Sequence, residues 1–116
     1  MPKDDRLYLG HMLEAARRVV AKTSGIDREA FDQDEDRRLA VVHFLQTLGE
    51  AARRVSTDQR RAYPEIPWQD IVAMRHKIVH DYFQVDENIV WNVATAELPS
   101  LVPVLARLVP HEPDAP

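Results

Sequence analysis

The short segment from Met74 to Tyr82 carries the residue types with the most chemistry in this chain: Arg75, His80 and Tyr82. Arginine binds phosphate oxygens through a planar fork of N–H donors and stays charged at physiological pH. Histidine has an unperturbed pKa that allows proton transfer near neutrality. Together these two side chains are the minimum set for phosphodiester chemistry without a metal ion, so the segment predicts a site that acts on phosphate.

Each of these residues also has an ordinary structural interpretation. Arg75 could form an ion pair with Asp70 or Glu50, and His80 could be a hydrogen-bonded histidine of the core. Tyr82 would then be an aromatic residue at the core rim or in an interface. Residue types alone leave both interpretations open.

A metal site is a third interpretation of the same segment. His76 and His80 have the i, i+4 spacing of a zinc-binding pair on a helix. Zinc sites need three or four protein ligands, and the sequence offers only Asp81 or the distant His43 as a third. We therefore expect no metal and no cofactor.

Apolar residues recur at helical spacing along most of the chain, which determines the elements that must position this segment. The first predicted helix starts at Asp4 or Asp5, either of which can cap it, and ends before Gly25. Residues 26–31 are predicted to form a short connecting turn. An all-helical first half follows from this pattern.

A second long helix is predicted to start at Asp32 or Asp34, because acidic residues favour a helix N-terminus, and to continue to Val55. Gly49 and its small neighbours should allow another helix to approach closely. Residues 57–61 are predicted to form a single helical turn.

Pro67 suits the first position of a third long helix, which is predicted to end near Phe83. A fourth helix is predicted from about Asp86, with Pro99 and Pro103 expected to kink or break it. No convincing alternating strand pattern appears. The sequence thus predicts an all-α bundle.

On a regular third helix, Arg75 and Tyr82 would lie on nearly the same face. Arg75 and His80 would be separated by roughly 140° around the axis and about 7.5 Å along it. This offset favours a groove over a stripe on one helix, and a second subunit could complete that groove.

Composition narrows the classes of protein to consider. The chain has 116 residues, no cysteine and a net charge of −4. These values predict one domain over residues 1–110 with a flexible tail at 111–116, in a reducing compartment such as the cytoplasm. The charged N-terminus and the lack of a long apolar run predict neither a signal peptide nor a membrane span.

Charge is unevenly distributed along the sequence. The acidic residues gather early, at Asp27, Glu29, Asp32, Asp34, Glu35 and Asp36. The basic residues gather in the middle, at Arg53, Arg54, Arg60, Arg61, Arg75 and Lys77. A polyanion could bind the second group, although both groups could equally be solvated helix faces.

The order of residues around the segment resembles HepT-like toxins of the HEPN superfamily. Arg75, His80 and Tyr82 match the family's R-x-x-x-x-H-x-Y motif. The resemblance extends over about residues 4–108. It also includes the segments Leu48-Gly49-Glu50-Ala51-Ala52, Pro64-Glu65-Ile66-Pro67-Trp68, Asp81-Tyr82-Phe83, Ile89-Val90-Trp91 and Leu98-Pro99.

This resemblance implies a HEPN-type bundle of four to five helices that forms a homodimer, with the motif at a shared cleft. It also implies a metal-independent endoribonuclease that acts as the toxin of a toxin–antitoxin pair. Arg75 and His80 would be the catalytic residues. His76, Glu50 and Lys77 would be accessory residues.

The same resemblance implies a partner and a mode of control. An MntA-like nucleotidyltransferase antitoxin would transfer AMP to Tyr82 and silence the toxin. The alternative hypothesis is a catalytically inactive subunit that docks the nucleotidyltransferase. Dependence of RNA cleavage on Arg75 and His80 distinguishes the two.

Overall fold

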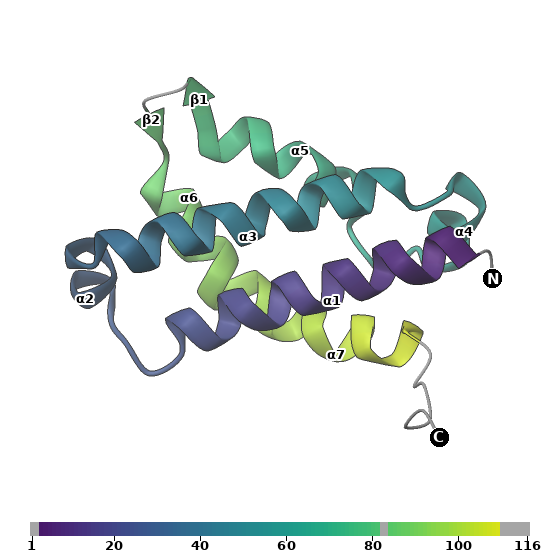
Figure 1. The fold of residues 1–116 in the computed structure, drawn as a ribbon, viewed down its shortest axis with the longest axis horizontal. Helices are drawn as coiled ribbons and strands as arrows, with labels where there is room; N and C mark the ends of the chain where they lie inside the picture. Colours follow the sequence, from purple (N-terminus) through teal and green to yellow (C-terminus); the bar gives the residue numbers. More distant parts are fainter. Residues whose placement is uncertain (1–2, 82–83, 110–116) are drawn as a thin grey trace.

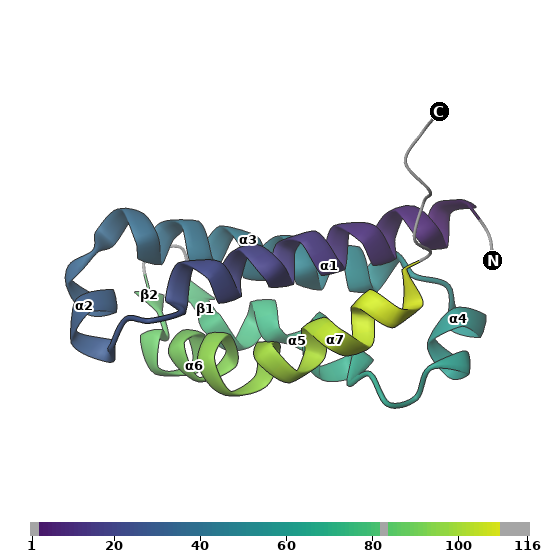
Figure 2. The ribbon, with the colours of Figure 1, turned by 90° about the horizontal axis from the view of Figure 1, so that it is seen from below.

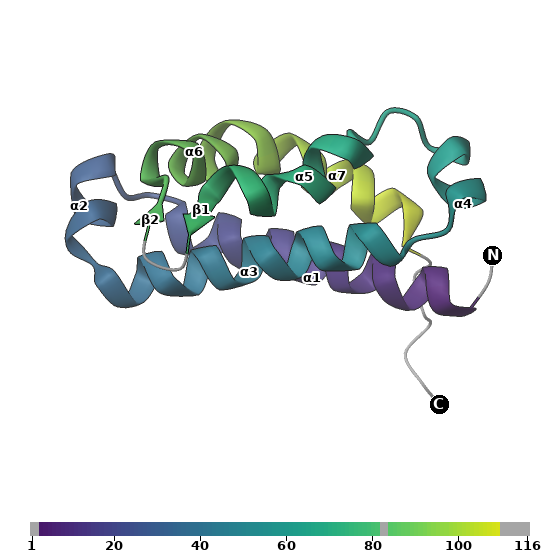
Figure 3. The ribbon, with the colours of Figure 1, turned by 90° about the horizontal axis from the view of Figure 1, so that it is seen from above.

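The computed structural model describes residues 3–81 and 84–109, which form two packed layers of helices. Helices α1 and α3 make one layer, and α5, α6 and α7 make the other (Figures 2 and 3). The helices are α1 (Lys3–Thr23), α2 (Arg28–Gln33), α3 (Glu35–Arg54), α4 (Thr57–Ala62), α5 (Trp68–Ile78), α6 (Glu87–Asn92), the π-helical segment η1 (Val93–Glu97) and α7 (Leu98–Leu108). Because α6, η1 and α7 run on continuously, four long helical segments build the bundle (Figure 1), which confirms the all-α prediction.

The core lies between the two layers and is built from the apolar faces of the long helices. Leu9, Met12 and Val19 of α1 are fully buried, as are Leu45 and Leu48 of α3. The spacing of these residues keeps them on one face of each helix, so the helices pack side by side (Figure 1). Helix α7 contributes Leu98, Leu101 and Leu105 to the same core.

The start of α1 differs from the prediction. Neither Asp4 nor Asp5 precedes the helix, because α1 already includes both in its first turn. Asp5 is buried and accepts hydrogen bonds from the backbone N–H and the hydroxyl of Ser56. At the other end, Gly25 has a φ of 78°, the left-handed conformation that the sequence predicted for it.

The segment after Gly25 is more regular than predicted. The turn expected at residues 26–31 is instead the helix α2, capped by the Asp27 side chain, which accepts a hydrogen bond from Ala30 N–H. Phe31 is fully buried, and its ring packs against the ring of Trp91 with 5.1 Å between the two ring centroids. Burial of this one aromatic side chain stabilises a helix that is too short to form by itself.

Close contact between α3 and α5 depends on Gly49, as predicted. A Cβ atom at this position would lie 3.1 Å from the carbonyl oxygen of Ile71. Helix α3 begins after Asp34, whose side chain accepts a hydrogen bond from Arg37 N–H. Helix α5 begins after Pro67, whose carbonyl accepts from Ile71 N–H. Both predicted helix starts are therefore confirmed to within one residue.

The end of α5 is the largest departure from the prediction. The helix does not reach Phe83 but ends at Ile78, where β1 (Val79–Asp81) begins and pairs antiparallel with β2 (Gln84–Val85). Val79 pairs with Val85, and the N–H of Asp86 donates to the carbonyl of Ile78 at 2.8 Å. The returning chain satisfies this carbonyl, and β-branched valines favour strand over helix.

The last helical segment tolerates its two prolines without breaking. The side chain of Asp86 caps α6 by accepting from the N–H groups of Asn88 and Ile89. The N–H of Leu98 bonds to the carbonyl of Val93, so the register widens by one residue through η1 just before Pro99. The predicted break therefore does not occur, and a π-helical turn lies just before Pro99.

The segment Glu87–Leu108 is long and apolar enough to cross a membrane by length and composition alone. Buried core helices meet the same criteria, and Leu98, Leu101 and Leu105 of α7 are buried in the core. We therefore assign this segment to the helical core. The predicted tail at 111–116 lies outside the described residues.

Candidate nuclease site

The motif segment changes secondary structure between its two predicted catalytic residues. Arg75 lies in the last turn of α5, whereas His80 lies in β1 (Figure 1). The helical offset calculated from the sequence does not apply, because no single helix carries both residues. Their side chains, and Tyr82 as a whole, lie outside the described part of the chain, so their roles stay predictions.

Two predicted accessory residues lie directly after Arg75. His76 and Lys77 are both exposed on α5. Lys77 also lines an open cleft beside the helix. Because both side chains are exposed, a large substrate could contact them; buried side chains would be inaccessible to it. Within residues 3–81 and 84–109, no group of three or more histidine, aspartate or glutamate residues could hold a metal ion.

The cleft beside the motif lies between α5 and the α6–α7 segment and has a volume of about 800 Å³. Its floor is apolar, with Ile71, Met74 and Leu101 among the lining residues. Its rim carries the acidic residues Asp70 and Glu97. A phosphate backbone would be repelled by these carboxylates, so this cleft is poorly suited to polyanion binding.

Glu50, the third predicted accessory residue, pairs with arginines of its own helix. Its carboxylate accepts from Arg53 Nη2 at 2.8 Å and from Arg54 Nε at 3.1 Å. Hydrogen bonds from Arg53 and then Arg54 lower the pKa of Glu50 from 4.5 to about 2. An orienting role toward Arg75 or His80 stays a prediction.

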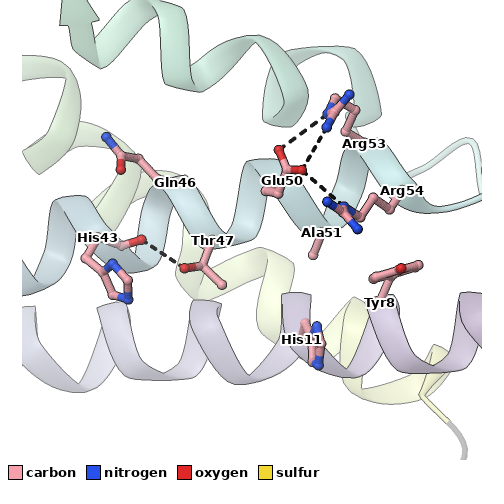
Figure 4. A pocket seen from close by; sticks show the side chains of 9 residues that line it. All are labelled: Tyr8, His11, His43, Gln46, Thr47, Glu50, Ala51, Arg53 and Arg54. Atoms are coloured by element: carbon pink, nitrogen blue, oxygen red, sulfur yellow. Dashed lines mark hydrogen bonds and ion pairs between the residues drawn. The ribbon is translucent and has the colours of Figure 1, made fainter.

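A second groove, which the sequence did not predict, lies between α1 and α3 and has a volume of about 590 Å³. Figure 4 shows the lining residues, with Tyr8 and His11 on α1 and His43, Thr47 and Glu50 on α3. The sequence contained one indication of this groove, the i, i+3 pair Tyr8 and His11. The groove itself forms only when α1 packs against α3. We name this feature the α1/α3 groove.

The described residues form a small all-α bundle, consistent with the HEPN class, in which Arg75 lies in the last turn of α5 and His80 in the strand that follows. The chain belongs to the HepT-like family, whose model, described as ribonuclease HepT-like, matches residues 12–108. The match includes the whole motif and all four long helical segments, except the first turns of α1.

Relatives in archaea and bacteria support this placement along nearly the full chain. The probable ribonuclease HepT of Thermococcus cleftensis is 35% identical over 87% of this chain and 92% of its own. The RNase candidate TTE0752 of Caldanaerobacter subterraneus is 31% identical over 95% of this chain and 98% of its own. The RNase candidate MJ1380 of Methanocaldococcus jannaschii is 31% identical over 85% of this chain and 91% of its own. No solved structure matches the chain.

Proposed function

We propose that this protein is a metal-independent endoribonuclease. The observation that carries the proposal is the family match across residues 12–108, which spans Arg75, His80 and Tyr82 in the expected order. The relatives' names point to the same activity over nearly the same length of chain. RNA is the substrate class that needs the fewest groups from the protein, because its 2′-hydroxyl serves as the nucleophile.

The reaction follows from the two motif side chains. One group removes the proton from the 2′-hydroxyl, whose oxygen attacks the adjacent phosphorus, and the bond to the 5′-oxygen breaks. A proton is delivered to that leaving oxygen. The products are a 2′,3′-cyclic phosphate and a 5′-hydroxyl. His80 moves one of these protons, as general base or general acid, which contributes roughly 10²–10⁴-fold in rate.

Arg75 stabilises the charge that develops on the non-bridging phosphoryl oxygens, through a bidentate contact. Arg75 lies in the last turn of α5, and His80 follows five residues later in β1. Lys77 and His76, exposed beside Arg75, are accessory contacts for the substrate backbone. Glu50 is an accessory residue that orients Arg75 or His80.

The wider biological assignment rests on the family resemblance. The protein is the toxin of a cytoplasmic toxin–antitoxin pair and forms a homodimer that brings two motifs to a shared cleft. An MntA-like nucleotidyltransferase antitoxin transfers AMP from ATP to the Tyr82 hydroxyl, with release of pyrophosphate. The anionic AMP group then competes with RNA for Arg75 and His80.

The test is cleavage of RNA by purified, mass-verified unmodified protein in excess EDTA, beside Arg75→Ala and His80→Ala. Cleavage by the wild type alone supports the proposal. Cleavage by all three proteins locates the activity elsewhere or in a contaminant. No cleavage by any folded protein that still accepts AMP favours the alternative, a catalytically inactive subunit that docks the nucleotidyltransferase.

A further inference from the structure

The α1/α3 groove combines aromatic rings with arginines in a repeated arrangement. At one end, the guanidinium of Arg54 lies over the ring of Tyr8, 5.8 Å from its centroid. The Tyr8 ring meets the ring of His11 at 6.1 Å, edge to face. These three side chains come from both helices, so the packing of α1 on α3 creates the cluster (Figure 4).

Beside the groove, the contact between α1 and α3 carries a similar arrangement of other residues, Arg18 and Phe44, which are not among the groove's lining residues. The guanidinium of Arg18 lies 5.5 Å from the centroid of the Phe44 ring. Phe44 in turn meets His43 at 5.3 Å, and His43 lines the groove. Tyr8 and Arg18 are both on α1, ten residues apart, which corresponds to about 15 Å along the helix.

The arginines are placed to bind an anion from solvent. The side chains of Arg53 and Arg54 are 61% and 53% exposed, although both contact Glu50. Two guanidinium groups share this one carboxylate, so the pair carries an excess positive charge. Each guanidinium has five N–H donors, and Glu50 occupies only part of them.

These features together match the chemistry of a single-stranded nucleic acid. Bases stack on aromatic faces regardless of sequence, while guanidinium groups bind the phosphates between them. At roughly 3.4 Å per stacked nucleotide, a seam of about 15 Å accommodates about four nucleotides. The acidic rim of the cleft beside α5, with Asp70 and Glu97, offers no comparable surface.

We propose that the α1/α3 groove is a binding site for single-stranded RNA, separate from the cleavage motif. This inference rests on the proposed ribonuclease function, since the RNA held there is its substrate. Helix α3 packs against both α1 and α5 (Figure 1). Helix α3 is therefore shared between the groove and the contact with the helix that carries Arg75.

The test is fluorescence anisotropy of a labelled single-stranded oligoribonucleotide in EDTA, with every protein carrying His80→Ala so that the RNA stays intact. The groove variants are the double substitution Arg53→Gln with Arg54→Gln, and the single substitution Tyr8→Leu. The matched control is Arg107→Gln, which removes a charge from the exposed face of α7. Circular dichroism and thermal melting confirm that each variant folds.

We expect Tyr8→Leu to weaken RNA binding about tenfold, because one base no longer stacks on the ring. The double arginine variant should also lower the salt dependence, by about 0.7 in log K per log salt for each phosphate that the protein no longer neutralises. Arg107→Gln should bind like the parent protein. Equal weakening by Arg107→Gln and the groove variants would reduce the effect to net charge and overturn the proposal.

Two further outcomes would also overturn it. One is unchanged RNA affinity in both groove variants. The other is a difference in molecular mass between a groove variant and the parent protein, measured by light scattering without RNA. Such a difference would make the groove a protein interface. Failure of the proposed function shows separately: protein without His80→Ala would then bind RNA through the groove and leave it uncut.

Discussion

Asp5 and Ser56 join the start of α1 to the start of α4 across 51 residues of sequence. The Ser56 N–H donates to Asp5 Oδ1 at 2.8 Å, and the Ser56 hydroxyl donates to Asp5 Oδ2 at 2.7 Å. The same hydroxyl accepts from Gln59 N–H and so caps α4. One buried carboxylate therefore fixes both the end of α3 and the helix that follows it.

Replacing Asp5 should destabilise the fold markedly. Asp5→Ala leaves the partly buried N–H of Ser56 without its acceptor, which costs about 1–3 kcal/mol in the free energy of unfolding. Urea denaturation measures this effect. The neighbouring Asp4→Ala is the control, because Asp4 is exposed. Equal effects of the two substitutions would show that the Asp5–Ser56 contact does not stabilise the protein.

Two glycines with different surroundings, one at the contact of α3 with α5 and one in open space on α1, should respond to substitution in opposite ways. Gly49→Val places side-chain atoms against the carbonyl of Ile71 and should cost about 1–3 kcal/mol by separating the helices. Gly10→Ala meets no atom within 4 Å and should stabilise α1 by about 0.5–1 kcal/mol. Thermal melting of both variants checks this pair. A neutral Gly49→Val would mean that α5 can move without cost.

Glu87 provides a pH-dependent prediction. Burial raises the pKa of Glu87 above its ordinary value, although Arg38 lies 3.8 Å away and lowers it in part. A raised folded-state pKa means that ionisation destabilises the fold as pH rises through that value. Glu87→Gln should therefore be more stable than the parent at pH 7, with the difference lost below about pH 4, where the parent is protonated in both states.

The control for this pH profile is Glu35→Gln, an exposed glutamate that also lies in the first turn of its helix. It should show no stabilisation at pH 7, since it removes only the favourable interaction of a carboxylate with the helix N-terminus. A less stable Glu87→Gln at pH 7 would mean that the attraction to Arg38 outweighs the burial.

Tyr82 is predicted to be needed for silencing and not for cleavage. Tyr82→Phe removes the hydroxyl that would accept AMP while keeping the ring, so the variant should cleave RNA even after incubation with ATP and an active nucleotidyltransferase. Mass spectrometry follows the added AMP, and gel analysis follows the RNA. Loss of cleavage in unmodified Tyr82→Phe would instead assign the hydroxyl to the reaction itself.

The helix starts show how far local sequence determines this fold. Capping by Asp34 and Asp86 and the left-handed Gly25 were all predictable, because each depends on residues within one turn. Gly49 correctly predicted a close helix contact for a similar reason. A glycine has no side chain, so a neighbouring helix can occupy the space beside it. The family resemblance likewise needed only the order of residues.

The tertiary structure decided the rest, since it depends on residues far apart in sequence. Phe31 turns a predicted loop into α2 because Trp91 covers it, and α5 ends at Ile78 because Asp86 returns to bond with its carbonyl. The α1/α3 groove has the same origin. Tyr8 and Arg54 carry no joint signal in the sequence, and only the packing of two antiparallel helices brings the ring and the guanidinium together.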